Sequence, residues 1–455
     1  MKVDTSIFKA YDIRGIYPDS IDEEIAEKVG RAYAIILKGE NPGKKLTVVV
    51  GEDMRLSSPS LKKSLIKGLT ESGLNVSDVG LVSTPTFYFA VAYYKYDGGI
   101  QVSASHNPKE YNGLKMTRGR GIPVGGDTGI MEIKDLVVKN KFENAKTKGK
   151  VAKRDNVLID AEIVQSKNID TSKIKPFKIV ADAANAMGAL DLEAVFSQLS
   201  CKLVKLNFKL DGTFPAHHPD PLKEETLTQL KEAVVKEKAD MGIAPDGDGD
   251  RYFFIDEKGE TVPQPILRGL MAQIELKENP GATVCYDVRP GRITRDMIEE
   301  VGGKAVVTRV GHSLIKETML KEDAVFGGES SGHYFYKFPY GTFEAPIVLV
   351  LKFLLYLSEQ NKPLSEVIKP YKRYFHSGEI NSDVKDKEAK MEEIVKKYSD
   401  GKLSRLDGIT IEYPDYWFNV RASNTEPLLR FALEAKTKEL MGKKRDEITK
   451  LIWNN

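Results

Sequence analysis

The chain has 455 residues and a formal net charge of only +2, from 68 basic and 66 acidic side chains. This length exceeds what one hydrophobic core usually supports, so about three or four domains are expected. The near balance of charge excludes a global field that would recruit nucleic acid or an anionic membrane, and any anion binding must depend on local clusters.

The apolar segments predict a protein without a membrane anchor. The start of the chain lacks the apolar core of a signal peptide, and the longest apolar run, Ile347–Leu357, is too short to span a bilayer and is predicted to be a buried helix. Cys201 and Cys285 have no Cys-x-x-Cys spacing, which predicts reduced thiols. We therefore expect a cytoplasmic protein that binds neither membranes nor nucleic acid.

Three times along the chain, a β-rich run is followed by a polar turn and a helical pattern. Leu46–Val50 is the first run, and it leads into a helix with Ser58 as the predicted N-cap. The second and third runs are Ile179–Asp182 and Val284–Asp287. This alternation predicts stacked α/β domains with mixed sheets.

The end of the chain has a different pattern, which predicts a separate α+β domain. Its predicted strands are Gly378–Asn381, Ile409–Tyr413, Trp417–Val420 and Leu428–Leu433, and its predicted helices are Lys387–Tyr398 and Lys438–Trp453. Charged or polar stretches near 139–154, 256–260 and 362–370 suggest the domain boundaries. We expect domains at 1–150, 151–257, 258–369 and 370–455.

An acidic loop lies between two apolar runs, Met241–Ala244 and Tyr252–Ile255, which are both predicted to be strands. Asp246, Asp248 and Asp250 alternate with glycines that allow the backbone to fold around one cation. Oxygen ligands of this kind suit Mg²⁺. The alternative of a calcium loop requires glycine at the sixth position, where this chain has Arg251. The loop therefore predicts a magnesium site at a strand end.

A second polar turn, Ser103–Pro108, follows another apolar run, and Lys115 lies a short distance downstream. A serine beside a divalent ion can act as a nucleophile or carry phosphate, and Lys115 could move a proton. The chemistry of the residues does not choose between Ser103 and Ser105.

Several motifs in the same order resemble the α-D-phosphohexomutase superfamily, specifically bacterial phosphomannomutase/phosphoglucomutase. The motifs are Tyr11–Gly15, Ser105–Pro108, Asp246–Arg251, Gly328–His333 and Arg421–Pro427. The resemblance runs nearly end to end. It implies three similar α/β domains and a C-terminal α+β domain around a central cleft, with a phosphoserine loop, a metal loop, a sugar-binding loop and a phosphate-binding loop in chain order.

The resemblance also implies the roles of single residues. Ser105 would carry the phosphate and bind the metal with Asp246, Asp248 and Asp250, and the further catalytic residues would be Lys115, His312 and Arg251. Substrate contacts are expected from Tyr11, Arg14, Arg289, Glu329, Ser330, Ser331, Gly332, His333, Arg421, Ser423, Asn424 and Thr425. The family places Glu329 and Ser331 at sugar O3 and O4, from which we infer tolerance of both glucose and mannose, since these sugars differ at C2.

The chain departs from the family pattern at three places. Arg289 stands where lysine is common, Glu52 stands where arginine is common, and Glu344-Ala345 replaces an acidic pair. Arginine keeps the charge at position 289 but changes its geometry, which leaves the phosphate contact there open.

The predicted reaction is reversible transfer of phosphate between C1 and C6 of hexose phosphates. It would proceed through phosphoserine and a 1,6-bisphosphate, with Mg²⁺ as cofactor and glucose or mannose 1,6-bisphosphate as activator. The expected assembly is a monomer or weak dimer. Alternatives are a metal-dependent sugar phosphatase that uses the same serine, a mutase that prefers glucosamine phosphate, and a binding protein without catalysis.

Overall fold

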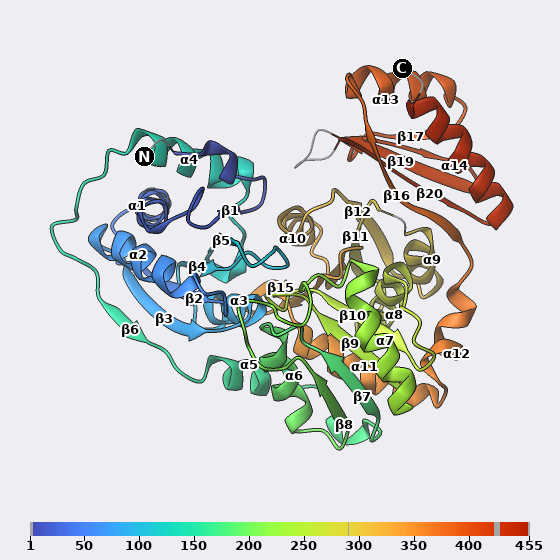
Figure 1. The fold of residues 1–455 in the computed structure, drawn as a ribbon, viewed down its shortest axis with the longest axis horizontal. Helices are drawn as coiled ribbons and strands as arrows, with labels where there is room; N and C mark the ends of the chain where they lie inside the picture. Colours follow the sequence, from blue (N-terminus) through green and yellow to red (C-terminus); the bar gives the residue numbers. More distant parts are fainter. Residues whose placement is uncertain (1–2, 290, 423–427, 454–455) are drawn as a thin grey trace. The chain divides into compact units, whose positions relative to one another are not determined.

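Figure 1 shows a computed structural model of the chain, which describes residues 3–289, 291–422 and 428–453. The chain forms two compact units. The first consists of the residues up to Val262 together with Ser331–Val367, and the second consists of Pro263–Ser330 together with the residues from Ile368 onward. Four sheets with their flanking helices give the predicted four-domain α/β architecture. The central cleft and the exact domain boundaries stay predictions.

The first domain has a six-stranded sheet in the order β1-β5-β4-β2-β3-β6. Strands β2, β3, β4 and β6 pair in parallel, and β5 and β1 run antiparallel to their neighbours. The strands are β1 (Ile13–Ile16), β2 (Thr47–Glu52), β3 (Asn75–Leu81), β4 (Gly98–Val102), β5 (Tyr111–Arg118) and β6 (Val151–Lys153). The helices are α1 (Glu23–Glu40), α2 (Ser58–Glu71), α3 (Thr84–Tyr93) and α4 (Met131–Lys139).

Helices α1 and α2 pack against each other and bury their apolar faces on this sheet (Figure 1). Leu61, Leu65 and Leu69, spaced for one helix face, are fully buried. The predicted N-cap was wrong by one residue, because Ser57 occupies that position. Ser58 instead donates its hydroxyl hydrogen bond to Asp53, at 2.6 Å.

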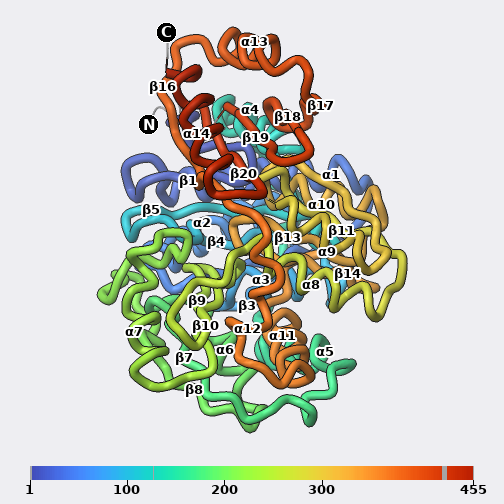
Figure 2. The backbone as a smooth tube through the Cα atoms, turned by 90° about the vertical axis from the view of Figure 1, so that its right-hand side faces the viewer, coloured from blue at the N-terminus to red at the C-terminus, as the bar shows by residue number. Residues whose placement is uncertain are grey.

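The second domain has a four-stranded sheet in the order β10-β9-β7-β8. Strand β7 pairs in parallel with β8 and β9, and β10 runs antiparallel to β9. The elements are α5 (Val157–Ser166), β7 (Lys178–Asp182), α6 (Gly188–Ser197), β8 (Lys202–Leu206), α7 (Thr228–Glu237), β9 (Met241–Pro245) and β10 (Tyr252–Asp256). Figure 2 shows α7 beside β9 and β10, where it covers one face of the sheet.

The third sheet contains β11 paired in parallel with β12 and β13, together with the antiparallel hairpin of β14 and β15. The strands are β11 (Thr283–Asp287), β12 (Lys304–Thr308), β13 (Phe326–Gly328), β14 (Tyr334–Phe338) and β15 (Gly341–Glu344). The helices are α8 (Gln264–Glu278), α9 (Arg292–Glu300), α10 (His312–Lys321), α11 (Pro346–Gln360) and α12 (Leu364–Ile368). Helix α11 is the predicted buried helix, and it packs against α5 and α6.

The C-terminal domain has an antiparallel sheet in the order β16-β20-β19-β18-β17, which confirms the predicted α+β class. Its strands are β16 (Phe375–Asp383), β17 (Lys402–Ser404), β18 (Ile409–Glu412), β19 (Tyr416–Ala422) and β20 (Leu428–Ala435). Helices α13 (Lys387–Lys397) and α14 (Lys438–Trp453) pack on this sheet around a core that includes Phe418 and Phe431.

Within the described parts of the chain, the helices are too short or too polar to cross a lipid bilayer.

Candidate active site

The acidic loop connects β9 to β10 and folds around the carboxylate of Asp246. Asp246 Oδ1 accepts backbone N–H groups from Gly249 and Asp250, both at 3.1 Å, and from Arg251 at 3.2 Å. Gly249 has a φ of +78°, in the left-handed region that favours glycine. These bonds fix a tight turn at the end of a buried strand.

The three loop carboxylates form a cluster with the properties of a cation site. Asp246, Asp248 and Asp250 are all buried, and one ligand oxygen from each lies within 4.8 Å of the others. Burial, reinforced by Asp250 and Asp248, raises the pKa of Asp246 to about 8. Asp248 Oδ1 is buried without a hydrogen-bond partner among the described residues. A cation would satisfy this oxygen and allow all three carboxylates to ionise together.

The predicted nucleophile lies against this cluster. Ser105 is in the turn between β4 and β5 and is 2% exposed, and its Oγ donates to Asp246 Oδ2 at 2.8 Å. His106 Nδ1 lies 3.1 Å from the same hydroxyl. Ser103 Oγ instead accepts the backbone N–H of Ser105 at 3.0 Å. The chemistry of the residues did not decide whether Ser103 or Ser105 is the nucleophile. In the structure, the hydroxyl of Ser105 donates a hydrogen bond to the aspartate cluster.

A glycine brings the two loops into backbone contact. A Cβ atom on Gly247 would lie 2.3 Å from the carbonyl oxygen of Ser105, which is far inside contact distance. Only glycine leaves space for this approach. The main chains of the serine turn and the metal loop therefore lie in close contact, and the Ser105–Asp246 hydrogen bond connects the two loops.

Lys115, on β5, lies in the same cluster and is 4% exposed. Its Nζ donates to Asp248 Oδ2 at 2.5 Å and to Asp250 Oδ2 at 2.7 Å. Burial alone would lower the pKa of Lys115, but the two carboxylates raise it well above its ordinary value. The same lysine, against the opposing effect of burial, holds the pKa of Asp250 well below its usual range. Asp248 and Asp250 thus bind the ammonium of Lys115 and are also two of the three carboxylates of the candidate cation site.

The start of helix α3 supports the cluster, although no motif in the sequence marks it as part of the site. Thr84 donates its side-chain hydroxyl to Asp248 Oδ2 at 2.6 Å, and its backbone N–H to Asp248 O at 3.0 Å. Next to it, Ser83 and Thr86 donate to the buried carboxylate of Asp191, at 3.0 and 3.3 Å. These contacts join residues more than 100 positions apart, so sequence patterns could not reveal them.

The N-terminal motif also reaches the serine turn. Arg14, on β1, donates to the side chain of Asn107, and it forms an ion pair with Asp12. Although burial opposes it, the carboxylate of Asp12 raises the pKa of Arg14. Tyr11 lies just before β1. The structure therefore brings Arg14, a predicted substrate contact, beside the turn that carries Ser105.

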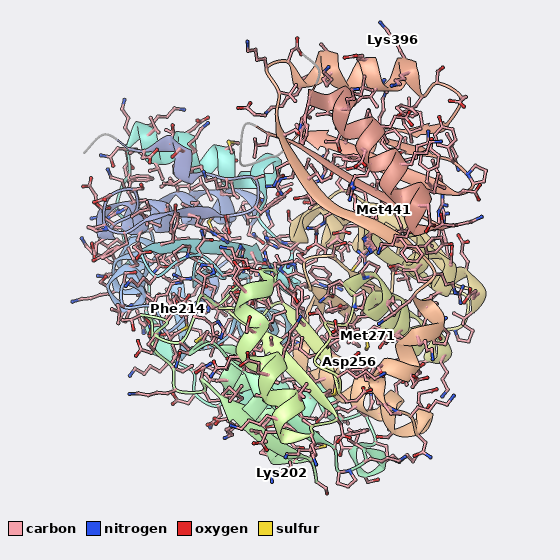
Figure 3. The ribbon with its side chains drawn as sticks, turned by 45° about the vertical axis from the view of Figure 1, so that its right-hand side comes forward. Lys202, Phe214, Asp256, Met271, Lys396 and Met441 are labelled. Atoms are coloured by element: carbon pink, nitrogen blue, oxygen red, sulfur yellow. The ribbon has the colours of Figure 1, made fainter. Side chains whose placement is uncertain are left out.

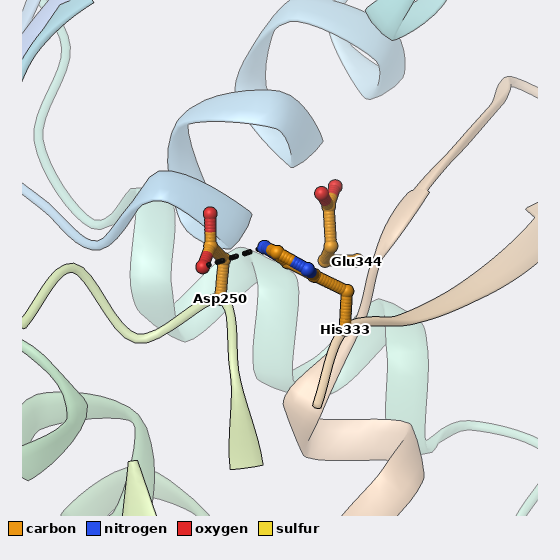
Figure 4. A group of neighbouring side chains, drawn as sticks. All are labelled: Asp250, His333 and Glu344. Carbon is orange, nitrogen blue, oxygen red and sulfur yellow. Dashed lines mark ion pairs between the residues drawn. The ribbon is translucent and has the colours of Figure 1, made fainter. Parts of the chain in front are cut away.

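A second group of possible metal ligands adjoins the aspartates, and Figure 4 shows its members, Asp250, His333 and Glu344. His333 Nε2 lies 3.2 Å from Asp250 Oδ1, and His333 Nδ1 lies 2.9 Å from Ser331 Oγ. The Nε–H of Arg251 points to His333 Nε2 at 3.4 Å. Gly332 O accepts the backbone N–H of Tyr252 at 2.9 Å. Part of the predicted sugar loop thus lies at the metal loop.

In the second unit, a buried carboxylate organises the remaining predicted sugar contacts. Asp287, at the end of β11, accepts from Arg268 Nη1 at 2.7 Å, from Arg289 Nε at 2.8 Å and from the hydroxyl of Ser330 at 2.9 Å. Against the effect of burial, Arg289 and Arg268 lower the pKa of Asp287 to about 2. Sequence reasoning missed Asp287 and Arg268, although the position of Asp287 at a strand end was a usable signal.

Glu329 lies in the same group. Its Oε1 accepts the backbone N–H of Gly311 at 2.9 Å and lies 3.8 Å from Arg289 Nη2. Gly311 is the N-cap of α10, whose first residue is His312. The structure therefore brings Glu329, Ser330, Arg289 and the start of the His312 helix close to one another.

In the C-terminal domain, Arg421 lies on β19 and is 4% exposed. Its Nη2 donates to Glu379 Oε2 at 2.9 Å, across the sheet on β16. The other predicted phosphate contacts, Ser423, Asn424 and Thr425, lie outside the described residues.

Four protein-family models match successive parts of the chain. They describe the α/β/α domains I, II and III of phosphoglucomutase/phosphomannomutase, which match residues 5–144, 161–259 and 266–374. The C-terminal domain of the same family matches residues 379–451.

Similar proteins match over nearly their whole length. The chain is 42% identical to a phosphomannomutase of Vibrio cholerae, over 98% of each chain. It is 41% identical to a phosphomannomutase of Methanocaldococcus jannaschii, over 99% of this chain and 98% of the relative. A crystal structure of a phosphoglucomutase/phosphomannomutase family protein from Burkholderia thailandensis matches with a TM-score of 0.91 and 32% identity, over 99% of this chain and 97% of that one.

Proposed function

This chain belongs to the phosphoglucomutase/phosphomannomutase family, and we propose how its residues perform the reaction of such an enzyme. It is a phosphohexomutase, an isomerase that moves phosphate within hexose phosphates. We propose that phosphate moves reversibly between C1 and C6 of mannose and glucose phosphates, through a 1,6-bisphosphate that also serves as activator. Because one serine serves both carbons, the bisphosphate turns end over end between the two transfers.

Ser105 is the proposed carrier of the phosphate. The observation that supports this most strongly is the hydrogen bond of its hydroxyl to Asp246, inside a group of three buried carboxylates. A serine hydroxyl is a weak nucleophile unless a base or a cation is beside it. Phospho-Ser105 would donate its phosphate to one carbon and recover a phosphate from the other.

The proposed metal site consists of Asp246, Asp248, Asp250 and the phosphorylated Ser105, and hard oxygen ligands of this kind favour Mg²⁺. When bound, the ion neutralises charge on the transferring phosphate. Arg251 adds a cation to the same place, since its Nε lies 3.8 Å from Asp246 Oδ2. Together these groups offset the charge that would otherwise repel a phosphosugar.

Proton transfer is assigned to Lys115 and His312. Lys115 donates to Asp248 and Asp250, which are also the proposed ion ligands, so its proton affinity and ion binding are coupled. The assignment of His312 rests on the family motif and on its position at the start of α10.

The substrate contacts stay those that the sequence predicts. They are Tyr11, Arg14, Arg289, Glu329, Ser330, Ser331, Gly332, His333, Arg421, Ser423, Asn424 and Thr425. Arg289 donates from both Nε and Nη2 to Asp287 Oδ2, which supports a fixed cation beside Glu329. We also propose the domain boundaries 1–150, 151–257, 258–369 and 370–455, a cytoplasmic location, and a monomer or weak dimer.

A coupled assay tests this function. Mannose 1-phosphate, glucose 1-phosphate and glucosamine 1-phosphate are compared with a trace of bisphosphate, and the expected products are the corresponding 6-phosphates. Release of inorganic phosphate without formation of a 6-phosphate would indicate that the protein is a phosphatase and not a mutase. Mass spectrometry of the peptide should place the phosphate on Ser105. Ser105→Ala should abolish turnover, whereas Ser103→Ala should retain the phosphopeptide, and phosphate on Ser103 would refute the assignment.

A further inference from the structure

A buried arginine that the reaction does not use gathers the backbone of the serine turn. Arg55 follows β2 and is 1% exposed. Its Nη2 donates to the carbonyl oxygens of Ser105 at 2.8 Å and Asn107 at 2.6 Å. Its Nη1 donates to those of Pro108 at 2.6 Å and Tyr111 at 3.0 Å. One guanidinium therefore binds four carbonyl oxygens between Ser105 and the first residue of β5.

The carboxylate of Asp53 fixes the position of the guanidinium. Arg55 Nε lies 3.3 Å from Asp53 Oδ2, and Asp53 Oδ1 accepts the backbone N–H of Arg55 at 3.0 Å. Ser58 donates to the same Asp53 oxygen at 2.6 Å. The planar guanidinium has five N–H donors in a fixed arrangement and can serve four carbonyl oxygens at once, whereas the ammonium of lysine has only three donors.

A segment of the second domain, residues 212–219, also contacts Arg55. The ring of Phe214 lies 5.1 Å from Arg55 Cζ, and Figure 3 labels this residue. A Cβ on Gly212 would lie 2.8 Å from Arg55 Cα, so the two backbones are in close contact. Further along this segment, Pro219 O accepts the backbone N–H of Gly247 at 3.1 Å. Residues 212–219 thus contact both Arg55 and the metal loop.

The backbone of Ser105 needs this support. Its φ is +49°, in the left-handed region that a serine rarely adopts. Such a conformation persists only where the surroundings determine it. The carbonyl of Ser105 is the group that Arg55 holds, and the hydroxyl of the same residue is the group that reaches Asp246.

We propose that Arg55 is a positioning residue, which fixes the serine turn so that the Ser105 hydroxyl is aimed at the aspartate cluster. This inference rests on the proposed function for its catalytic consequence. Its structural content, that Arg55 orders the turn, can be measured without activity.

The test compares Arg55→Lys with Arg31→Lys. Arg31 also binds carboxylates, those of Glu27 and Glu71, but lies on α1 away from the site. In Arg55→Lys, kcat should fall on the order of 100-fold while KM changes less than about threefold, because the nucleophile is misplaced and the substrate contacts remain. Backbone amides of residues 104–111 should exchange hydrogen at least about tenfold faster, with no change in α1. Arg31→Lys should retain the wild-type kcat.

Phe214→Leu is the second variant if Arg55→Lys does not fold. It should change kcat and the exchange of residues 104–111 in the same direction, but less. Wild-type exchange and kcat in either folded variant would overturn the inference. A wild-type enzyme that stays without phosphate on Ser105 after incubation with the bisphosphate would instead refute the proposed function, whereas unchanged exchange in Arg55→Lys would refute the role of Arg55 alone.

Discussion

The contact between Gly247 and Ser105 predicts that a single methyl group disables the enzyme without unfolding it. Ordinary contact begins at 3.4 Å, whereas an added Cβ would lie 2.3 Å from the Ser105 oxygen and 3.0 Å from its carbonyl carbon. One of the two loops must therefore retreat by about 1 Å in Gly247→Ala. The φ of Gly247 is not in the left-handed region, so alanine adds no backbone strain there and the substitution acts only through the steric clash of its Cβ.

A misplacement of about 1 Å at a reacting group costs roughly 100-fold in rate, or about 2.7 kcal/mol of activation free energy. We expect this loss in kcat, measured with the coupled assay under saturating substrate and bisphosphate. Gly39→Ala is the matched control, because nothing lies within 4 Å of its Cβ position on α1. A kcat of Gly247→Ala within about threefold of the wild type would show that the reaction does not depend on this spacing of the two loops.

Three further changes probe the cluster. Lys115→Met should lower kcat by about 10²–10⁴-fold in the coupled assay, because it removes the proposed proton carrier; retained activity would exclude that role. Thr84→Val removes the 2.6 Å bond to Asp248, so Mg²⁺ affinity by calorimetric titration should weaken about 10–100-fold, and an unchanged affinity would contradict the contact. Burial raises the pKa of Asp191 to about 7, against the Ser83 and Thr86 hydrogen bonds. Because the unfolded carboxyl ionises at lower pH, the wild type should lose roughly 3 kcal/mol of unfolding free energy between pH 5 and 8. Asp191→Asn should not show this loss in urea titrations at pH 5 and 8, and parallel losses in both proteins would refute the assignment.

Much of the fold follows from local patterns. The final helix, Lys438–Trp453, has its predicted bounds, and the strands on both sides of the acidic loop lie within one residue of their predicted ends. These elements have strong periodicity or lie between clear turn residues. The capping serine of α2 was missed because Ser57 and Ser58 are chemically alike, and only the contact of Ser58 with Asp53 separates them.

The candidate site was predictable where its chemistry is concentrated in a few adjacent residues, as in Asp246–Arg251. Its supporting residues were not. Thr84 and Asp248 are 164 positions apart, and no spacing rule connects them. The choice between Ser103 and Ser105 needed either the family resemblance or the observed hydrogen bond to Asp246. A sequence read without homologues shows which chemistry is present but not which side chains hold it in place.

The carboxylate of Asp287 has a consequence for engineering sugar preference. It connects Arg268 of α8, Arg289 of the loop after β11 and Ser330 of the predicted sugar loop. A library that varies position 289 or 330 therefore also removes hydrogen bonds to Asp287. Many variants would lose the shape of the loop before they gain a new sugar specificity. Libraries that keep these four residues fixed and diversify their neighbours should contain a larger share of working catalysts.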